Sequence, residues 1–270
     1  SLFKFTNQTM NYPIYQVDAF TTKLFSGNPA CVVTLKKWLA DDLLLKIAKE
    51  NAVAETAFFI DNGKEIQLRW FTPDLEIDLC GHATLAAAHV LKSEFKHPAN
   101  PLLFNTQSGK LEVLFKNDYY HLNFPARKSL STDLPRAIKS ALNIQPKEIY
   151  KARDYLLVYE NQQEIENIKI DRQIFDTINL GVGGVIVTAK GDASDFVSRF
   201  FTPQATILED PVTGSAHCTL IPFWSSRILK KNLEALQLSN RGGRLLCSDV
   251  SERVIIGGQA ILFSIGEFSL

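Results

Sequence analysis

Short apolar runs dominate the chain, rich in β-branched and aromatic residues and separated by Gly, Asn or Asp, as is typical of β-strands. They predict strands at 13–20, 30–35, 56–60, 102–106, 110–116, 119–124, 154–159, 184–188, 234–239, 243–247, 253–256 and 259–265. Apolar residues at helical spacing predict helices over 41–50, 83–92, 133–142, 171–179 and 216–230. Because strands and helices do not alternate regularly, the pattern favours an α+β fold over a Rossmann sheet.

One pattern occurs twice. Residues 68–86 read LRWFTPDLEIDLCGHATLA, and residues 198–220 read SRFFTPQATILEDPVTGSAHCTL, with a slightly longer loop. Each copy has Arg, two aromatic residues, Thr and Pro, then an acidic and apolar loop, then Gly-x-Ala opening a predicted helix. The repeat predicts two similar halves related by a pseudo-twofold axis. Equivalent loops would then face each other across one cleft, which is a common place for a small-molecule site.

The expected organisation follows from this repeat. Residues 10–127 form the N-terminal half and residues 128–270 the C-terminal half, with the last strand, 258–270, expected to pack back on the N-terminal half. Residues 1–9 have no pattern of their own and are interpreted as a leader or a cloning remnant.

Composition narrows the function classes. The chain is 46% hydrophobic, which is enough for a substantial core, and its 29 Lys and Arg balance 29 Asp and Glu. No net field attracts nucleic acid or anionic lipid. The four cysteines are scattered, and no apolar run reaches the length of a membrane span. We therefore expect a cytoplasmic protein with free thiols, without nucleic-acid or membrane partners.

Glu55 lies within the apolar run AVAETAFFI and is the one charged residue between Glu50 and Asp61. A buried carboxylate without partners is costly, so such groups are paired, neutralised or used. A partly desolvated carboxyl group is suited to taking and returning a proton near neutral pH. The alternative is a solvated glutamate at a helix–strand junction.

The turns at Gly81 and Gly214 both lie where a loop becomes a helix. Backbone N–H groups at such ends are free and carry positive partial charge, so two ends facing one cleft could hold a carboxylate. The alternative is that Thr213, Ser215 or Asp210 simply caps the second helix.

Cys80 and His82 also suggest two other chemistries. A metal site would need at least three ligands with fitting geometry, and no acidic ligand pattern completes one, so no metal is expected. A racemase with two facing thiols would use Cys80, but the repeat aligns Cys80 with Thr213, which cannot act as the second base. Asp210, nearby in the sequence, could.

Four ordered motifs carry a family resemblance: YQVDAFTTKLFSGNPACVV, ENAVAETAFF, RWFTPDLEIDLCGHATLAAAHVL and EDPVTGSAH. From Tyr12 to the C-terminus the chain resembles the phenazine-biosynthesis PhzF-like isomerases. The resemblance implies a diaminopimelate-epimerase-like fold. Such a fold has two similar α+β halves, each a strongly curved, mostly antiparallel sheet wrapped on a central helix, with the active site in the cleft between them.

The resemblance also implies roles for residues. Glu55 matches the catalytic glutamate that moves a proton between carbons of a small carboxylated metabolite, and His82 and Asp210 match residues that bind and orient the substrate beside it. The residues expected to bind substrate are Asn28, Cys80, Gly81, Thr213, Gly214 and Ser215. No cofactor is implied, and a homodimer is expected. A racemase using Cys80, or a catalytically silent binding protein of the same fold, stays an alternative.

Overall fold

The computed structural model describes residues 10–270, so the segment interpreted as a leader or cloning remnant, residues 1–9, lies outside the described residues. The first half contains β1 (Asn11–Ala19), β2 (Asn28–Thr34), α1 (Asp41–Asn51), β3 (Glu55–Asp61), β4 (Ile66–Phe71), β5 (Glu76–Ile77), α2 (Gly81–Ser93), β6 (Leu102–Thr106), β7 (Gly109–Lys116) and β8 (Tyr119–Pro125). The second contains β9 (Leu130–Ser131), α3 (Arg136–Ala141), β10 (Glu148–Lys151), β11 (Tyr155–Val158), α4 (Gln162–Asn167), α5 (Arg172–Phe175), β12 (Val185–Lys190), β13 (Phe196–Phe201), α6 (Gly214–Ile228), β14 (Asn232–Gln237), β15 (Gly243–Val250), β16 (Arg253–Gly258) and β17 (Ala260–Ser269).

Two helices are shorter than the sequence predicted. The helix expected over 133–142 begins only at Arg136, after Pro135 in the N-cap position. The helix expected over 171–179 is a single turn, α5, and the chain then bends at Gly181, whose φ of 60° favours glycine. Strand β10 and helix α4 were not predicted, because both are too short for a periodic signal.

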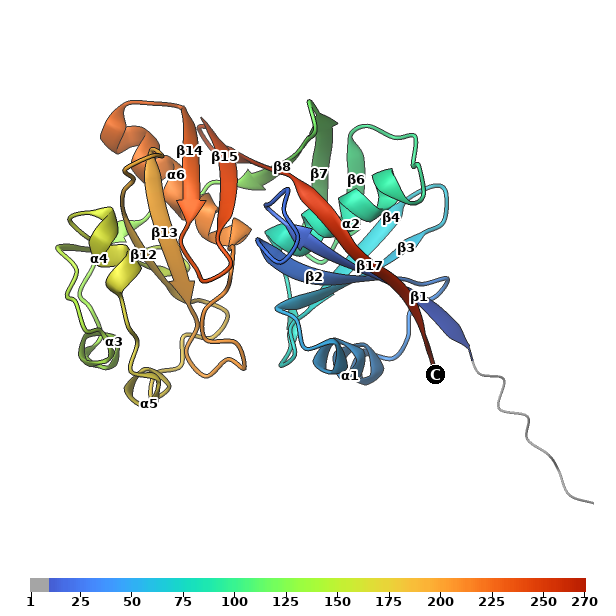
Figure 1. The fold of residues 1–270 in the computed structure, drawn as a ribbon, viewed down its shortest axis with the longest axis horizontal. Coiled ribbons are helices and arrows are strands. Elements are labelled where there is room, and N and C mark those ends of the chain that lie inside the picture. Colours follow the sequence, from blue (N-terminus) through green and yellow to red (C-terminus); the bar gives the residue numbers. More distant parts are fainter. Residues whose placement is uncertain (1–9) are drawn as a thin grey trace, which may run out of the picture.

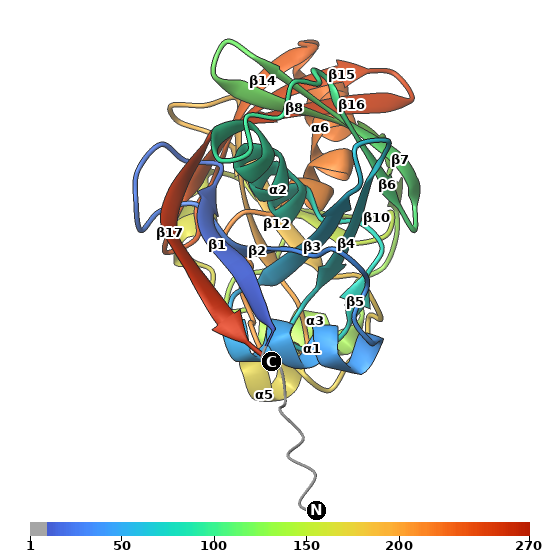
Figure 2. The same cartoon turned by 90° about the vertical axis from the view of Figure 1, so that its right-hand side faces the viewer.

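Each half wraps its sheet around one central helix, α2 in the first lobe and α6 in the second (Figure 1). Nearly every residue of α2 from Gly81 to Leu91 is buried, and α6 is equally enclosed from Gly214 to Ile221. Such a helix is apolar or small on all faces, which explains the alanine-rich sequence of α2. Figure 2 shows α2 surrounded by the strands of its lobe. The expected α+β class with two similar halves is confirmed.

Strand register shows how the halves correspond. In the first half Thr56 on β3 lies opposite Phe71 on β4, and in the second Val185 on β12 lies opposite Phe201 on β13. Both phenylalanines begin an F-T-P sequence. Thr56 and Val185 are therefore equivalent positions.

The same correspondence extends to an ion pair beside each F-T-P loop. Arg69 holds Glu76 through two hydrogen bonds of 2.7 Å, and Arg199 holds Glu209 through two bonds of 2.7 and 2.9 Å. Two parallel bonds fix both partners in orientation as well as distance. Each arginine therefore anchors the loop that follows its strand.

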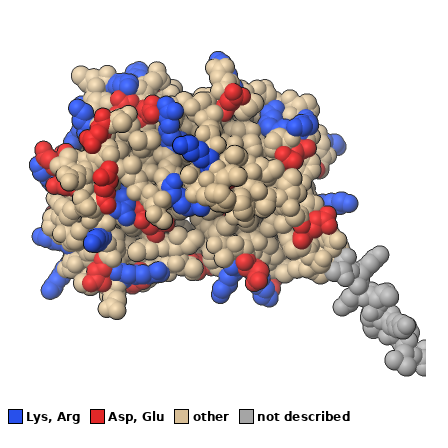
Figure 3. Space-filling view, viewed as in Figure 1, with Lys and Arg blue, Asp and Glu red and all other residues tan. Residues whose placement is uncertain are grey.

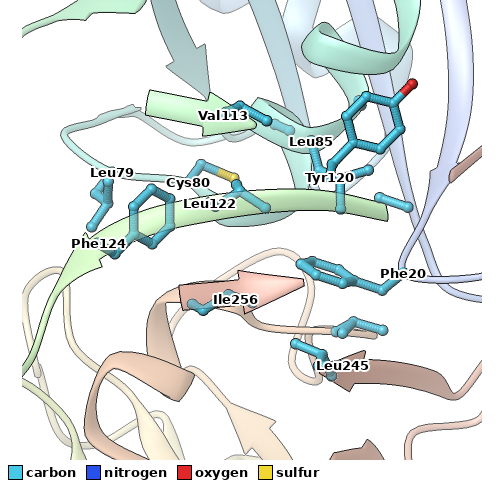
Figure 4. Packing of buried hydrophobic residues seen from close by; sticks show 14 of the residues in the cluster. Phe20, Leu79, Cys80, Leu85, Val113, Tyr120, Leu122, Phe124, Leu245 and Ile256 are labelled. Carbon is cyan, nitrogen blue, oxygen red and sulfur yellow. The ribbon is translucent and has the colours of Figure 1, made fainter. Parts of the chain in front are cut away.

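The halves share strands and a core. Strand β8 of the first half pairs antiparallel with β16 of the second, and the last strand, β17, pairs with β1. The apolar cluster in Figure 4 accordingly joins Leu122 and Phe124 of β8 to Ile256 of β16. This continuous core fixes the relative position of α2 and α6.

Neither sign of charge dominates the face of the molecule drawn in Figure 3. Lys and Arg side chains alternate with Asp and Glu over the face shown in Figure 3. Within residues 10–270, none of the helices combines the length and the apolar character that crossing a membrane requires.

Candidate active site

A cavity of about 480 Å³ lies between the halves. Its wall combines the two F-T-P loops with the first residues of α2 and α6. Of the residues predicted from the sequence, it is lined by Glu55, Cys80, Gly81, His82, Asp210, Thr213, Gly214 and Ser215. Asn28 lies immediately behind this wall, fully buried. The predicted set therefore comes together at one place.

The N-termini of α2 and α6 touch. A Cβ atom built on Gly81 would lie only 2.9 Å from the Cα of Gly214, so only glycine allows this approach. Neither Cys80 nor Thr213, the N-cap residues, caps its helix with its side chain. The alternative of a helix cap formed by Thr213 is therefore wrong, since its hydroxyl donates to Asp210 Oδ2 at 2.6 Å instead. The positive ends of two helix dipoles thus meet at the cavity wall.

Glu55 is the first residue of β3 and reaches the cavity because the chain turns sharply after α1. Ala52 takes a left-handed conformation with φ of 54°, and Asn51 Nδ2 donates to Thr56 Oγ1 at 3.0 Å, which ties the helix end to the strand. The glutamate side chain is 14% exposed. It is therefore neither solvated nor sealed from the cavity.

Glu55 Oε2 lies 3.0 Å from His82 Nε2. The ring N–H is not directed at this oxygen, and neither atom has a hydrogen-bond partner in the described chain. Burial lowers the pKa of His82, but the charge of the adjacent Glu55 carboxylate raises it, and the pKa lies above its usual range. The two groups form an ion pair through buried atoms, and the exposed part of the Glu55 side chain lines the cavity.

Asn28 connects this pair to Asp210. Its Nδ2 donates to Asp210 Oδ1 at 2.7 Å and to the Val212 carbonyl at 2.9 Å, and it contacts His82 Nδ1 at 3.1 Å. An amide nitrogen has two hydrogens, and the two shorter bonds take both. The contact between Asn28 and His82 Nδ1 is therefore not a third hydrogen bond. His82 Nδ1 also lies 3.6 Å from the Cys80 sulfur.

The pKa of Asp210 is raised to about 6, chiefly by burial and then by the negative charge of Glu55. Bonds from Thr213 and Asn28 oppose this shift by stabilising the ionised form. Gln237, which is 1% exposed, holds the turn between Asp210 and Thr213. It donates to the Asp210 carbonyl and accepts from the Thr213 N–H, both at 2.8 Å.

Cys80 behaves as an apolar side chain. Burial, followed by the charge of Glu55, raises the pKa of its thiol, so the thiol stays protonated. Figure 4 shows it among Leu79, Leu122 and Phe124. A protonated thiol is a poor base.

Glu55, Cys80 and His82 bring possible metal-ligand atoms within 4.8 Å of one another. Their arrangement does not suit a single ion. The sulfur lies by His82 Nδ1 and the carboxylate by Nε2, whereas one ion takes one ring nitrogen.

Sequence reasoning missed two parts of the cavity wall. Arg153 belongs to neither copy of the repeat, and no motif marks it. Asp74, in the first F-T-P loop, accepts hydrogen bonds from Thr206 in the second, 3.1 Å from N and 2.8 Å from Oγ1. The internal repeat predicted facing loops, but not which residues would touch.

Glycine occupies the position in the second half that corresponds to Glu55. Glu55 precedes Thr56, and Gly184 precedes its equivalent, Val185. A Cβ atom on Gly184 would lie 2.4 Å from the Phe200 ring. The second half therefore has no room for a matching acid there.

Comparisons with known proteins agree with this geometry. The family described as phenazine biosynthesis-like protein, PhzC-PhzF, matches residues 17–266. An uncharacterized isomerase of Pseudomonas aeruginosa is 45% identical, over 97% of this chain and 100% of that protein. The crystal structure of a PhzF family protein of Enterococcus faecalis has a TM-score of 0.90 at 47% identity, over 97% of this chain and 100% of that chain.

A more distant structure bears on the fold alone. A hydroxyproline epimerase of Agrobacterium vitis has a TM-score of 0.59 at 11% identity, over 96% of this chain and 93% of that chain. The expected epimerase-like fold is confirmed, as is the expected reaction class, an isomerase. The chain belongs to the phenazine biosynthesis-like (PhzC-PhzF) family.

Proposed function

We propose that the protein is a cofactor-independent isomerase in which Glu55 moves a proton between two carbons of a small carboxylated metabolite. The observation that carries this proposal is the position of Glu55, 3.0 Å from His82 at the cavity wall where the uncapped ends of α2 and α6 meet. A base, a hydrogen-bond donor and an anion site thus converge.

In the proposed reaction, the Glu55 carboxylate takes a proton from a substrate carbon that is attached to a conjugated system, and this system includes the substrate's own carboxylate. The electron pair left by the C–H bond moves into the conjugated system and onto the carboxylate oxygens. Protonated Glu55 then returns the proton to a second carbon, where a new C–H bond forms. No atom or electron is gained or lost, so the balance requires no redox partner.

The transient negative charge needs stabilisation. The first backbone N–H groups of α2 and α6 and the His82 ring are fixed donors at a largely buried wall, where they are worth more than in water. Asn28 contacts the His82 ring and is itself held by its bond to Asp210. The pair of glycines keeps both helix ends at one site.

A single acid–base group is supported by the asymmetry between the halves. A racemase needs two bases on opposite faces of a carbon, but the second half has Gly184 where the first has Glu55. The thiol alternative is also weakened, because Cys80 is buried and protonated while its counterpart Thr213 bonds to Asp210. Homodimerisation, which the family resemblance implies, and a cytoplasmic location remain predictions.

The test measures deuterium incorporation from heavy water into a panel of small unsaturated and keto carboxylic acids, by NMR. The wild-type protein should exchange at least one of them, and Glu55→Gln should abolish exchange while retaining its melting temperature. Glu112→Gln, at an exposed strand position, is the matched control. An active Glu55→Gln variant would end the proposal. Absence of exchange across the panel would favour the silent binding alternative, and loss of exchange on alkylating Cys80 would favour the racemase.

A further inference from the structure

We infer that Arg153 recognises the anionic group of the substrate and positions it at the N-terminus of α6. This inference rests on the proposed function for the existence of a carboxylated substrate, but its test does not require turnover. Arg153 lies in the turn that leads into β11 and lines the cavity.

The guanidinium is rigidly held. Arg153 Nε donates to Asp154 at 3.0 Å and Nη2 donates to Asp154 at 2.8 Å and to Ser215 Oγ at 3.0 Å. Asp154 is completely buried and also accepts from the Gly184 N–H at 2.9 Å. Since Asp154 cannot swing away, Arg153 is oriented before any ligand arrives.

These bonds leave part of the guanidinium unused. An arginine has five N–H donors in a planar fork. Within the described part of the chain, no hydrogen bond from Arg153 Nη1 is found, and the side chain is 19% exposed at the cavity. The two remaining N–H groups of this fixed guanidinium, both on Nη1, are available to a carboxylate or another anion.

The internal repeat places Arg153 close to the counterpart of Asn28. Counted from the strand pairs β2–β3 and β11–β12, it lies one residue after that counterpart. Strand β2 runs parallel to β3 and begins at Asn28, while β11 runs parallel to β12 and is entered through Arg153. Asn28 contacts His82, the second residue of α2, and Arg153 contacts Ser215, the second residue of α6.

The two halves thus place different chemistry on one scaffold. The first half places His82 and Glu55 at its helix end, and both can hold a proton. The second half offers a hydroxyl and a permanently charged guanidinium, which are suited to binding instead. The acid–base group and the anion-binding group therefore lie on opposite halves of the cavity, which would orient a bound substrate between them.

The test uses benzoate and benzamide as probes, because they have the same shape and differ in charge. Dissociation constants are measured by NMR titration of the full chain. Wild-type protein should bind benzoate more tightly than benzamide. Arg153→Gln should weaken benzoate binding about tenfold, the value of one charge-assisted hydrogen bond, and leave benzamide binding unchanged. Arg153→Lys should restore part of the preference.

Two further variants serve as controls for misfolding and for the loss of an arginine–carboxylate pair as such. Arg153→Gln leaves the buried Asp154 unpaired, so Arg153→Gln with Asp154→Asn serves if the single variant does not fold. Arg227→Gln breaks a similar arginine–carboxylate pair, with Glu148, away from the cavity and should keep the wild-type preference. Failure of wild-type protein to bind benzoate, or an unchanged preference in Arg153→Gln, would overturn the inference. If heavy-water exchange requires Glu55 but not Arg153, the proposed function holds and the inference about Arg153 fails. If benzoate binding requires Arg153 but no exchange is seen, the inference holds and the proposed function fails.

Discussion

Gly81 and Gly214, one from each half of an internally duplicated chain, meet so closely that a methyl group on Gly81 would lie 2.9 Å from the Cα of Gly214. This contact brings the first turns of two buried helices to one cavity. Side chains elsewhere in the cavity then decide what the paired helix ends can do. The arrangement makes the backbone itself part of the site.

Replacing Gly81 by Ala should therefore lower both stability and exchange. The added methyl meets backbone atoms, so the helices must separate, and we expect a loss of roughly 1–3 kcal/mol in the free energy of unfolding. Urea unfolding and heavy-water exchange measure the two effects. Gly266→Ala is the control, because its nearest neighbour, Ile14 Cγ2, would lie 3.8 Å away. A stable and active Gly81→Ala variant would contradict the role given to this contact.

Asp210 should leave a signature in the pH dependence of stability. Its pKa is about 6 in the folded protein and close to 3.8 when solvated. Between these values the folded state keeps a proton that the unfolded chain has released. The stability contribution of Asp210 is therefore fully present below about pH 4 and lost as the pH rises through about 6.

The Asp210→Asn variant lacks this titration. Measured by urea unfolding, its stability relative to wild type should rise by roughly 1–3 kcal/mol between about pH 4 and about pH 7. Parallel pH profiles for the two proteins would show that Asp210 does not carry the raised pKa.

Cys80 should be dispensable for the reaction. Its thiol is buried and protonated, so Cys80→Ala should keep heavy-water exchange within about tenfold of wild type, the loss reflecting packing around His82. The rate of exchange at neutral pH is the measurement. Cys31→Ala, a buried thiol away from the cavity wall, is the control for packing alone. Complete loss of exchange in Cys80→Ala but not in Cys31→Ala would favour the thiol-based racemase.

The contact between Asp74 and Thr206 joins the two F-T-P loops at the surface of the cavity. Because both residues are exposed, Asp74→Ala should change the free energy of unfolding by less than about 1 kcal/mol. Benzoate should nevertheless dissociate faster, since the loops lose the bonds that hold them together. NMR line shapes measure the dissociation rate, and Asp133→Ala, at an exposed site outside the cavity, is the control. An unchanged rate would show that the loops do not restrict exit.

The sequence by itself determined the duplication, the α+β class and most of the candidate site. The pattern Arg-aromatic-F-T-P followed by Gly-x-Ala occurs twice because each half contains the same local structure. In each, a strand ends in a loop, and the loop leads into a buried helix. An isolated carboxylate in an apolar run marked Glu55 for the same local reason. Its neighbours in the chain are all apolar or neutral, and that is visible without a structure.

Only the tertiary structure decided which partners these residues meet. The bonds of Asn28 to Asp210, of Gln237 to Thr213 and of Arg153 to Ser215 join segments far apart in the chain. No local pattern marks Gln237 or Arg153, because their contacts depend on strand register and on how β8 and β16 join the halves. Periodicity reports which face of an element is buried, and it does not report what lies on the other side of a cleft.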